Sequence, residues 1–131
     1  MSSFDGRCGR YIWTKDTRPR EWILEADYEA FVAQHTLGNV YHCVQTADGE
    51  MKIFFDRQRG YGVNPDGFSA VDYTPYYVGD KVGVLNGSKV GQVGVIDAVG
   101  WHVNDGKVFF FIEFEGRVSS RRYWESDIEP S

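Results

Sequence analysis

Apolar residues alternate most regularly between Lys107 and Glu115, where the sequence reads KVFFFIEFE. Side chains at every second position of a strand point to the same face of a sheet. One face of this strand is apolar throughout and consists of Val108, Phe110, Ile112 and Phe114. The other face begins with Phe109 and Phe111 and ends with two glutamates. A strand that runs from a two-sided core to an edge open to water is typical of small, strongly bent five-stranded barrels.

Glycine-containing hairpins surround this strand over the last part of the chain. Val78–Leu85 alternates in the same way, Asn86-Gly87 is a strong hairpin signal, and Gln92–Val99 is expected to return as the next strand. Gly94, in the middle of that strand, indicates either a bulge or a close approach of backbone. Further strands are expected at Arg117–Tyr123 and Trp124–Ile128.

The first part of the chain combines short strands with one helix. Tyr11–Lys15 is rich in β-forming side chains and predicts a strand. Acidic residues among apolar ones, followed by Gly38, predict a helix over about Ala26–His35 with its apolar face against a sheet. Asn39–Thr46 and Glu50–Asp56 flank an Asp-Gly turn and predict a hairpin.

Two stretches of the chain, beginning at Gly38 and at Gly91, follow the same order of features. Each has a Gly-x-Val start, a strand, an Asp-Gly turn, an aromatic strand, further turns and an acidic end. Either the chain holds two related barrel-like lobes, or two runs of short hairpins look alike without being related. The predicted organisation is an N-terminal lobe over residues 1–76, with a barrel-like region at 38–74, and a second lobe over residues 77–131.

Charge and composition narrow the range of functions that we expect for this protein. The 131 residues carry a formal net charge of −5, and acidic residues outnumber basic ones 11 to 8 in residues 1–77 and 8 to 6 in residues 78–131. No lobe is basic, which disfavours tight non-specific binding to nucleic acid and to anionic membranes. Two cysteines, no signal-like N-terminus and no apolar run of roughly 20 residues lead us to expect a cytoplasmic protein.

One stretch resembles a known family. Val78–Ile96 reads VGDKVGVLNGSKVGQVGVI and is similar to the opening of SH3-like barrels of the KOW type, with matches at Gly79, Asp80, Val82, Gly87, Gly91, Gly94 and Val95. The ending YWESDIEP at Tyr123–Pro130 is similar to the last strand of such barrels. The residue pattern predicts a mainly β fold with one short helix (α+β). The resemblance implies a SH3-like small barrel at Val78–Pro130 and RNA binding. KOW modules commonly carry a lysine directly before the second glycine, where this chain has Val90 and the lysine is displaced to Lys89.

A mixed basic and aromatic surface is the candidate binding site. Its members are expected to gather on one side of the second lobe: Lys89, Trp101, His102, Arg121, Arg122, Tyr123 and Trp124. Aromatic rings stack on bases or hold a peptide, and arginine adds directed donors and cation–π contacts. In an alternative interpretation the two tryptophans belong to the core or its seam, and the two arginines pair across strands with Glu113, Glu115 or Glu125.

Metal binding and catalysis find no support in the residue pattern. The cysteines and histidines form no C-x-x-C or H-x-x-x-H element, and the neighbours His42 and Cys43 point to opposite faces of a strand. We therefore expect no metal, no cofactor and no catalytic residue.

Three hypotheses of function follow. The first is a non-catalytic module that binds another protein through an aromatic groove or an exposed strand edge, and an acidic chain suits a basic partner such as a bacterial toxin. The alternative is a KOW-type RNA-binding module that uses Lys89, His102, Arg121 and Arg122. A small enzyme, the third class, would need a deep pocket lined by convergent polar groups. The sequence indicates no oligomeric state.

Overall fold

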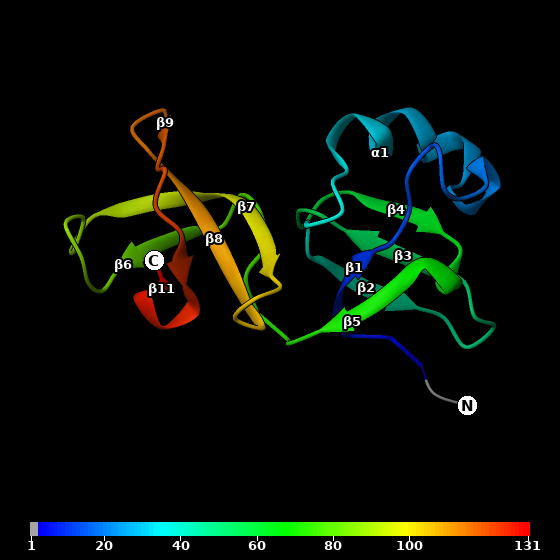
Figure 1. Ribbon diagram of the computed structural model, residues 1–131. Helices are drawn as coiled ribbons and strands as arrows, with labels where there is room; N and C mark the ends of the chain where they lie inside the picture. Colours follow the sequence, from blue (N-terminus) through cyan, green and yellow to red (C-terminus); the bar gives the residue numbers. More distant parts are fainter. Residues whose placement is uncertain (1–2) are drawn as a thin grey trace. The chain divides into compact units, whose positions relative to one another are not determined.

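The computed structural model describes residues 3–131 and divides the chain into two compact units (Figure 1). The first unit ends at Tyr73 and the second is Thr74–Ser131, whereas the sequence placed the boundary at 76/77. Each unit contains one antiparallel sheet, and the first also contains a short α-helix. The prediction of a mainly β fold with one short helix is therefore confirmed.

The first unit is built on a five-stranded sheet. Its strands are β1 (Cys8–Tyr11), β2 (Tyr41–Gln45), β3 (Met51–Phe54), β4 (Gly60–Val63) and β5 (Phe68–Val71). Their order in the sheet is β4-β3-β2-β1-β5, so the last strand pairs with the first. The predicted hairpin is the pair β2–β3, and its turn contains Gly49 with a φ of 92°, a conformation that favours glycine.

The first strand lies earlier than the sequence predicted. We expected a strand at Tyr11–Lys15, but only Tyr11 of that stretch belongs to β1. After Tyr11 the chain leaves the sheet, because Trp13 turns its ring into the core and donates its indole N–H to the Pro19 carbonyl at 2.9 Å. Gly9 lowers the strand propensity of this segment. Glycine is nevertheless required at this position, since a Cβ would lie 2.5 Å from the Phe68 ring.

Helix α1 (Tyr28–Gln34) lies within the predicted range and follows a single 3-10 turn at Glu25–Asp27. Its fully buried residue is Phe31, whose ring packs 6.1 Å from Tyr41 of β2 and 5.4 Å from Tyr61 of β4. The helix therefore rests its apolar face against the sheet, as the sequence predicted. Two further 3-10 turns, Arg20–Trp22 and Pro65–Gly67, lie in the same unit.

The second unit contains a six-stranded sheet. Its strands are β6 (Lys81–Val84), β7 (Val93–His102), β8 (Lys107–Phe114), β9 (Arg117–Val118), β10 (Tyr123–Trp124) and β11 (Ile128–Pro130). The order is β10-β8-β7-β6-β11, and β9 also pairs with β8. No hydrogen-bonded pairing of β10 with β11 closes this sheet among the described residues.

Strand β8 has the alternation read from the sequence. Its four even-numbered positions, Val108, Phe110, Ile112 and Phe114, are buried, while the odd-numbered ones are half-buried or exposed. Gly94 marks a close approach of backbone, because a Cβ there would lie 2.9 Å from the Glu113 carbonyl oxygen. The bulge of β7 lies elsewhere, between Ile96 and Ala98. Asn86-Gly87 also forms no two-residue turn, since the β6–β7 connection extends over residues 85–92.

The two sheets share one strand order. In each, the first four main strands form a meander, a 3-10 turn follows the fourth, and the fifth strand pairs with the first. The 3-10 turns are Pro65–Gly67 in the first unit and Glu125–Asp127 in the second. A side-chain oxygen accepts a backbone N–H at both turns, from Asp66 to Asn64 and from Trp124 to Asp127.

Candidate binding surfaces

Aromatic side chains gather on the side of the second sheet that faces away from its core. The register pairs Phe109 of β8 with Gly100 of β7 and with Trp124 of β10, and it pairs His102 with Lys107. Cross-strand partners point to the same face of a sheet. Phe109, Phe111, His102 and Trp124 therefore share the face opposite to the buried residues of β8.

These four rings contact one another edge to face. The His102 ring lies 5.7 Å from the Trp124 ring and 6.2 Å from the Phe109 ring, and Phe109 lies 5.4 Å from Phe111. The interplanar angles of 78° to 82° are those that the quadrupoles of aromatic rings favour. All four side chains are half-buried, so the cluster holds its shape and still reaches solvent.

Two cations lie over the rings. The Arg122 guanidinium carbon is 5.3 Å from the centre of Phe109, and the Lys107 ammonium is 5.7 Å from the Trp124 ring. At the edge of the cluster, the Asp105 carboxylate lies 3.3 Å from Nδ1 of His102. We call this surface the aromatic face, defined by His102, Lys107, Phe109, Phe111, Arg122 and Trp124.

Gly100 positions the centre of the aromatic face. A Cβ at this residue would lie 2.5 Å from the Phe109 ring, so the ring rests directly on the β7 backbone. Glycine inside a strand often marks such an approach. A larger side chain at Gly100 would lift Phe109 away from the sheet and separate it from His102.

The structure brings together only three of the seven residues that the sequence proposed as a binding site. His102, Arg122 and Trp124 belong to the aromatic face. Trp101 pairs with Val108 on the opposite face, and Tyr123 is buried in the core with 1% exposure. The prediction that all seven share one side is wrong, because adjacent residues of a strand point to opposite faces.

Of the last two of the seven, Lys89 belongs to the β6–β7 connection and Arg121 lies beside it. The Lys89 ammonium is 5.4 Å from the Phe114 ring, and the Arg121 guanidinium is 4.6 Å from Tyr123. Arg121 pairs with Asp127 at 3.6 Å rather than with one of the three glutamates of the alternative interpretation. It also reaches Asn86 Oδ1 at 3.4 Å.

Sequence reasoning missed Lys107, Phe109 and Phe111 as members of the aromatic face. The sequence contains a signal for the two phenylalanines, since they form the apolar start of the second face of β8. It does not contain the strand register, which sets Phe109 opposite Trp124 and Lys107 opposite His102.

The first unit carries a second candidate surface, a groove of about 960 Å³. It crosses the side of strands β2, β3 and β4 on which Val44, Lys52 and Gly62 lie opposite one another. One wall contains Trp22 and Leu24, and the other is the β2–β3 turn. We call it the acidic groove, because three carboxylates and one lysine line it: Glu21, Asp48, Glu50 and Lys52.

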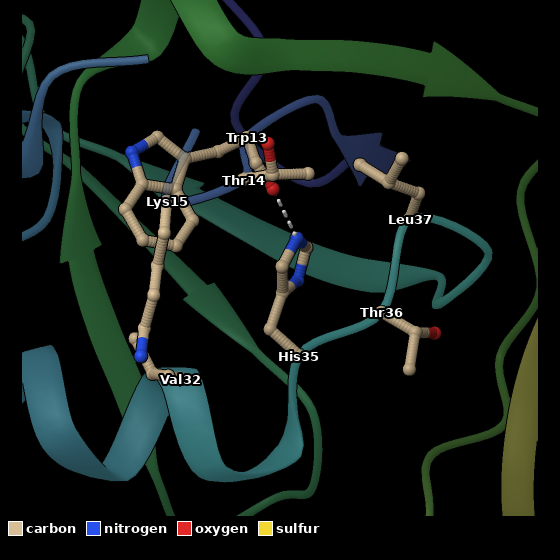
Figure 2. A pocket seen from close by; sticks show the side chains of 7 residues that line it. All are labelled: Trp13, Thr14, Lys15, Val32, His35, Thr36 and Leu37. Carbon is tan, nitrogen blue, oxygen red and sulfur yellow. Dashed lines mark hydrogen bonds between the residues drawn. The ribbon is translucent and has the colours of Figure 1, made fainter. Parts of the chain in front are cut away.

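A smaller pocket of about 190 Å³ lies where helix α1 ends (Figure 2). His35 forms its inner wall, and its Nε2–H donates to the Trp13 carbonyl at 3.0 Å. A carbonyl only accepts, so Nε2 carries the proton and Nδ1 accepts from the Tyr41 hydroxyl at 2.6 Å. Burial lowers the pKa of His35 and raises the pKa of Tyr41. Both groups are therefore neutral and hydrogen-bonded, which suits a structural role.

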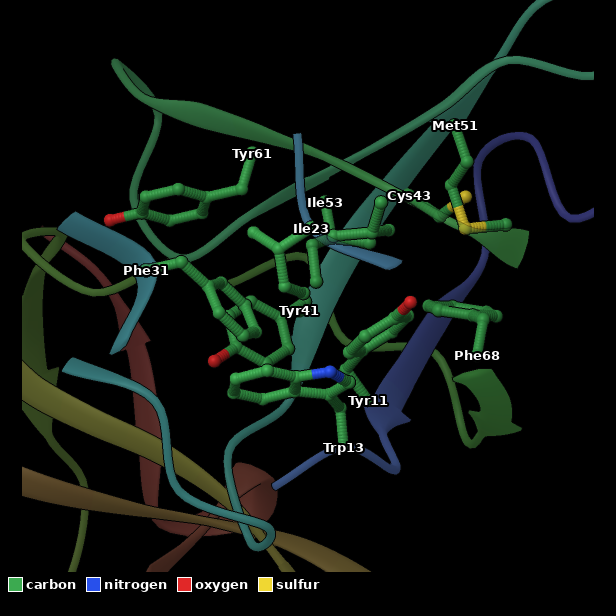
Figure 3. Close-up of a cluster of buried hydrophobic side chains, with 11 residues drawn as sticks. Tyr11, Trp13, Ile23, Phe31, Tyr41, Cys43, Met51, Ile53, Tyr61 and Phe68 are labelled. Atoms are coloured by element: carbon green, nitrogen blue, oxygen red, sulfur yellow. The ribbon is translucent and has the colours of Figure 1, made fainter. Parts of the chain in front are cut away.

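Behind this pocket lies the core of the first unit (Figure 3). It contains many aromatic rings, with Phe31, Tyr11, Trp13 and Tyr41 at its centre. Cys43 lies in it beside Met51, and burial raises the pKa of its thiol to about 12. A thiol with such a pKa is inert as a nucleophile at neutral pH.

Two absences are found among residues 3–131, the part of the chain that the structure describes. No three His, Cys, Asp or Glu side chains of this part of the chain are grouped as a metal ion would require. No helix in it has the length and apolar character needed to cross a membrane.

Comparison with known proteins identifies a family without a known role. No curated protein matches the chain. The model described as "Family of unknown function (DUF6960)" matches residues 1–129, so the chain belongs to that family.

Proposed function

We propose that this protein is a non-catalytic binding module and that the aromatic face of its second unit contacts a partner protein. The observation that carries the proposal is the cluster of four half-exposed rings on the outer side of a sheet whose core lies on the other side. The core of this unit, which includes Phe110, Ile112 and Tyr123, is complete without these rings. Contiguous apolar surface that the fold does not need is a common mark of interaction sites.

The composition of the aromatic face fits a protein interface. Tryptophan and arginine are enriched among the residues that contribute most to binding, and they act best at the centre of a patch with a polar rim. Trp124 and Phe109 lie centrally here, while Lys107, Arg122 and Asp105 surround them. The rings restrain one another, so little side-chain entropy is lost when a partner covers them.

Capture from extract of the native cell tests this function. Immobilised wild-type protein should retain a partner that protease removes and nuclease leaves in place. A Phe109→Ala, Trp124→Ala variant should lose it, since truncating a central aromatic residue costs about 2 kcal/mol or more of binding. Val103→Ala is the matched control, because Val103 is 68% exposed and lies outside the face. Retention by the double variant, or release by nuclease, would contradict the proposal.

RNA binding of the KOW type is the competing function. Its support is that Lys89 lies within the glycine-rich connection of residues 85–92 and Arg121 beside it, near the Phe114 and Tyr123 rings. Two observations weigh against it: Asp127 already pairs with Arg121, and Arg122 and Lys107 cover ring surfaces on which bases would stack. A filter assay decides, because an Arg121→Glu, Arg122→Glu variant should lose salt-sensitive RNA binding if this function is correct.

We also propose that each unit is a SH3-like small barrel and that the two are related halves. The shared strand order and the 3-10 turn before each fifth strand support this, as does the similarity of the stretches that begin at Gly38 and Gly91. In an experimental structure of the full chain, the five main strands of one unit should superpose on those of the other. Two flat sheets, each open along both edges, would contradict the proposal.

A reducing compartment such as the cytoplasm is the proposed location. Its support is that the chain has only two cysteines, Cys8 and Cys43, and that both are buried in neighbouring strands. Mass spectrometry of protein alkylated in the native cell should find both thiols reduced, and a disulfide would contradict this location.

A further inference from the structure

We infer that the acidic groove of the first unit binds a short segment of a partner that carries both apolar and basic side chains. This surface is separate from the aromatic face and does not depend on the function proposed for it. Its volume of about 960 Å³ is at the upper end of the range for ligand sites, roughly 300 to 1,000 Å³, and because the groove is open to solvent it suits a segment that is only partly covered.

Apart from Lys52, which lies between Val44 and Gly62, the floor and one wall of the groove are apolar. Val44 is 49% exposed and Leu24 is 55% exposed, although both lie beside regular backbone pairing. The Trp22 ring adds a half-buried aromatic side chain to the wall, with the Arg18 guanidinium 5.6 Å from its centre. Exposed apolar side chains around a hollow gain free energy when a ligand covers them.

Gly62 has no side chain, so the floor of the groove at this residue is the strand backbone. A Cβ at this position would lie 3.1 Å from Cβ and Cδ2 of Leu24, so no side chain fits between Leu24 and the sheet without displacing it. The backbone around the groove is already paired, since Leu24 N–H donates to Gly62 O and Asn64 N–H donates to Trp22 O. An added strand finds no free edge there, and a ligand must be recognised through its side chains.

Charge decides which segment fits. Glu21 lies on one wall, Asp48 and Glu50 lie in the opposite turn, and all three side chains are exposed. Lys52 is the basic side chain among the lining residues, whose net charge is −2, and counting Arg18 over the Trp22 ring leaves a net charge of −1. Carboxylates around an apolar floor attract a partner whose lysines or arginines flank apolar anchors and repel an acidic one.

Fluorescence anisotropy with three short labelled peptides tests the inference. The first mixes leucine and lysine, the second leucine and glutamate, and the third serine and lysine. Only the leucine–lysine peptide should bind, and its affinity should fall severalfold between about 50 and about 300 mM salt. Equal binding of the serine–lysine peptide would mean charge attraction alone and would overturn the inference, as would binding of the leucine–glutamate peptide or no binding.

Matched variants locate the binding. Glu21→Lys, Asp48→Lys, Glu50→Lys should weaken the leucine–lysine peptide by about tenfold or more. Asp16→Lys, Glu29→Lys, Asp72→Lys makes the same change of net charge at exposed positions outside the groove and should stay within about twofold. Trp124→Ala should change nothing, which separates this site from the aromatic face. Equal losses in both triple variants would overturn the inference. If the groove triple variant fails to fold, Val44→Asp in the wild-type background takes its place, with the same loss expected.

Discussion

The two units of this protein use the same strand order and place their aromatic residues differently. In the first unit the rings are inside, where Phe31 of the helix joins Tyr11, Trp13 and Tyr41 in one core. In the second, buried rings such as Phe110 and Tyr123 share the core with valines and isoleucines, and further, half-exposed rings occupy the outer side of the sheet. The strand order that the two units share constrains which residues face inward. The residues at outward positions are free to differ and can form a surface for binding.

The outer surfaces also differ in charge. The acidic groove is lined by three carboxylates and one lysine, whereas Lys107 and Arg122 lie on the rings of the aromatic face. Two surfaces of such different character fit different partners. We therefore expect the two units to bind different partners.

Truncating Phe31 should have the largest effect. Phe31→Ala removes the side chain that joins the helix to the sheet and should cost about 3 to 5 kcal/mol of unfolding free energy. Urea denaturation measures the loss, and amide exchange assigns it to the first unit. Phe111→Ala on the aromatic face is the control and should cost much less, because Phe111 is half-buried. Equal losses would mean that the two sets of rings play the same role.

Filling the close approach at Gly94 should come next. Gly94→Ala sets a Cβ against Ile112 and the Glu113 carbonyl and should cost about 1 to 3 kcal/mol. Gly83→Ala in the neighbouring strand is the matched control, since its Cβ would meet nothing nearer than Glu129 at 3.7 Å. The second unit should lose stability in thermal denaturation with the first variant only. A Gly94→Ala protein as stable as wild type would refute the close approach.

Lowering the pH should lower the free energy of unfolding of the first unit, because His35 is half-buried in it. Burial lowers the pKa of His35 in the folded state, so below a pH of about 6.5 the unfolded chain binds a proton that the folded chain does not. The free energy of unfolding should therefore fall as pH drops from about 6.5 toward the folded-state pKa and level off below it. Urea titrations at several pH values measure this slope. His35→Gln should abolish it, and an unchanged slope in that variant would assign the effect to another group.

Removing the Arg122 guanidinium from the aromatic face should have the smallest effect on the free energy of unfolding. Arg122→Ala should cost about 0.5 to 1 kcal/mol, since the cation–π contact with Phe109 is near the surface. Thermal denaturation measures the change, and Arg117→Ala, an exposed residue of β9, is the control. A loss above that range would mean that the aromatic face is a structural element of the fold.

Much of the fold was predictable because it depends on local patterns. The alternation in Lys107–Glu115 reflects a period of two residues and the stripe around Phe31 a period of about 3.6, while the Asp-Gly turn depends on two adjacent residues. The first strand escaped prediction because Cys8, Gly9 and Arg10 are weak strand formers. Its pairing on both sides, with β2 and β5, overrides that propensity.

The binding surfaces were less predictable than the fold. The run from Arg121 to Trp124 pointed to the correct part of the chain but included the buried Tyr123. The acidic groove gave no sequence signal, since its lining comes from residues 21–24, 44–52 and 62–65.

By itself, the sequence determined the class of the fold, the position of the helix, the inward face of β8 and the absence of a recognisable metal-ligand spacing. Each of these depends on residues that are neighbours along the chain. Only the tertiary structure decided that His102, Phe109 and Trp124 meet, that Trp101 does not join them, and that Glu21 faces the turn containing Asp48. The physical reason is that cross-strand register and a bulge between Ile96 and Ala98 set which side chains share a face.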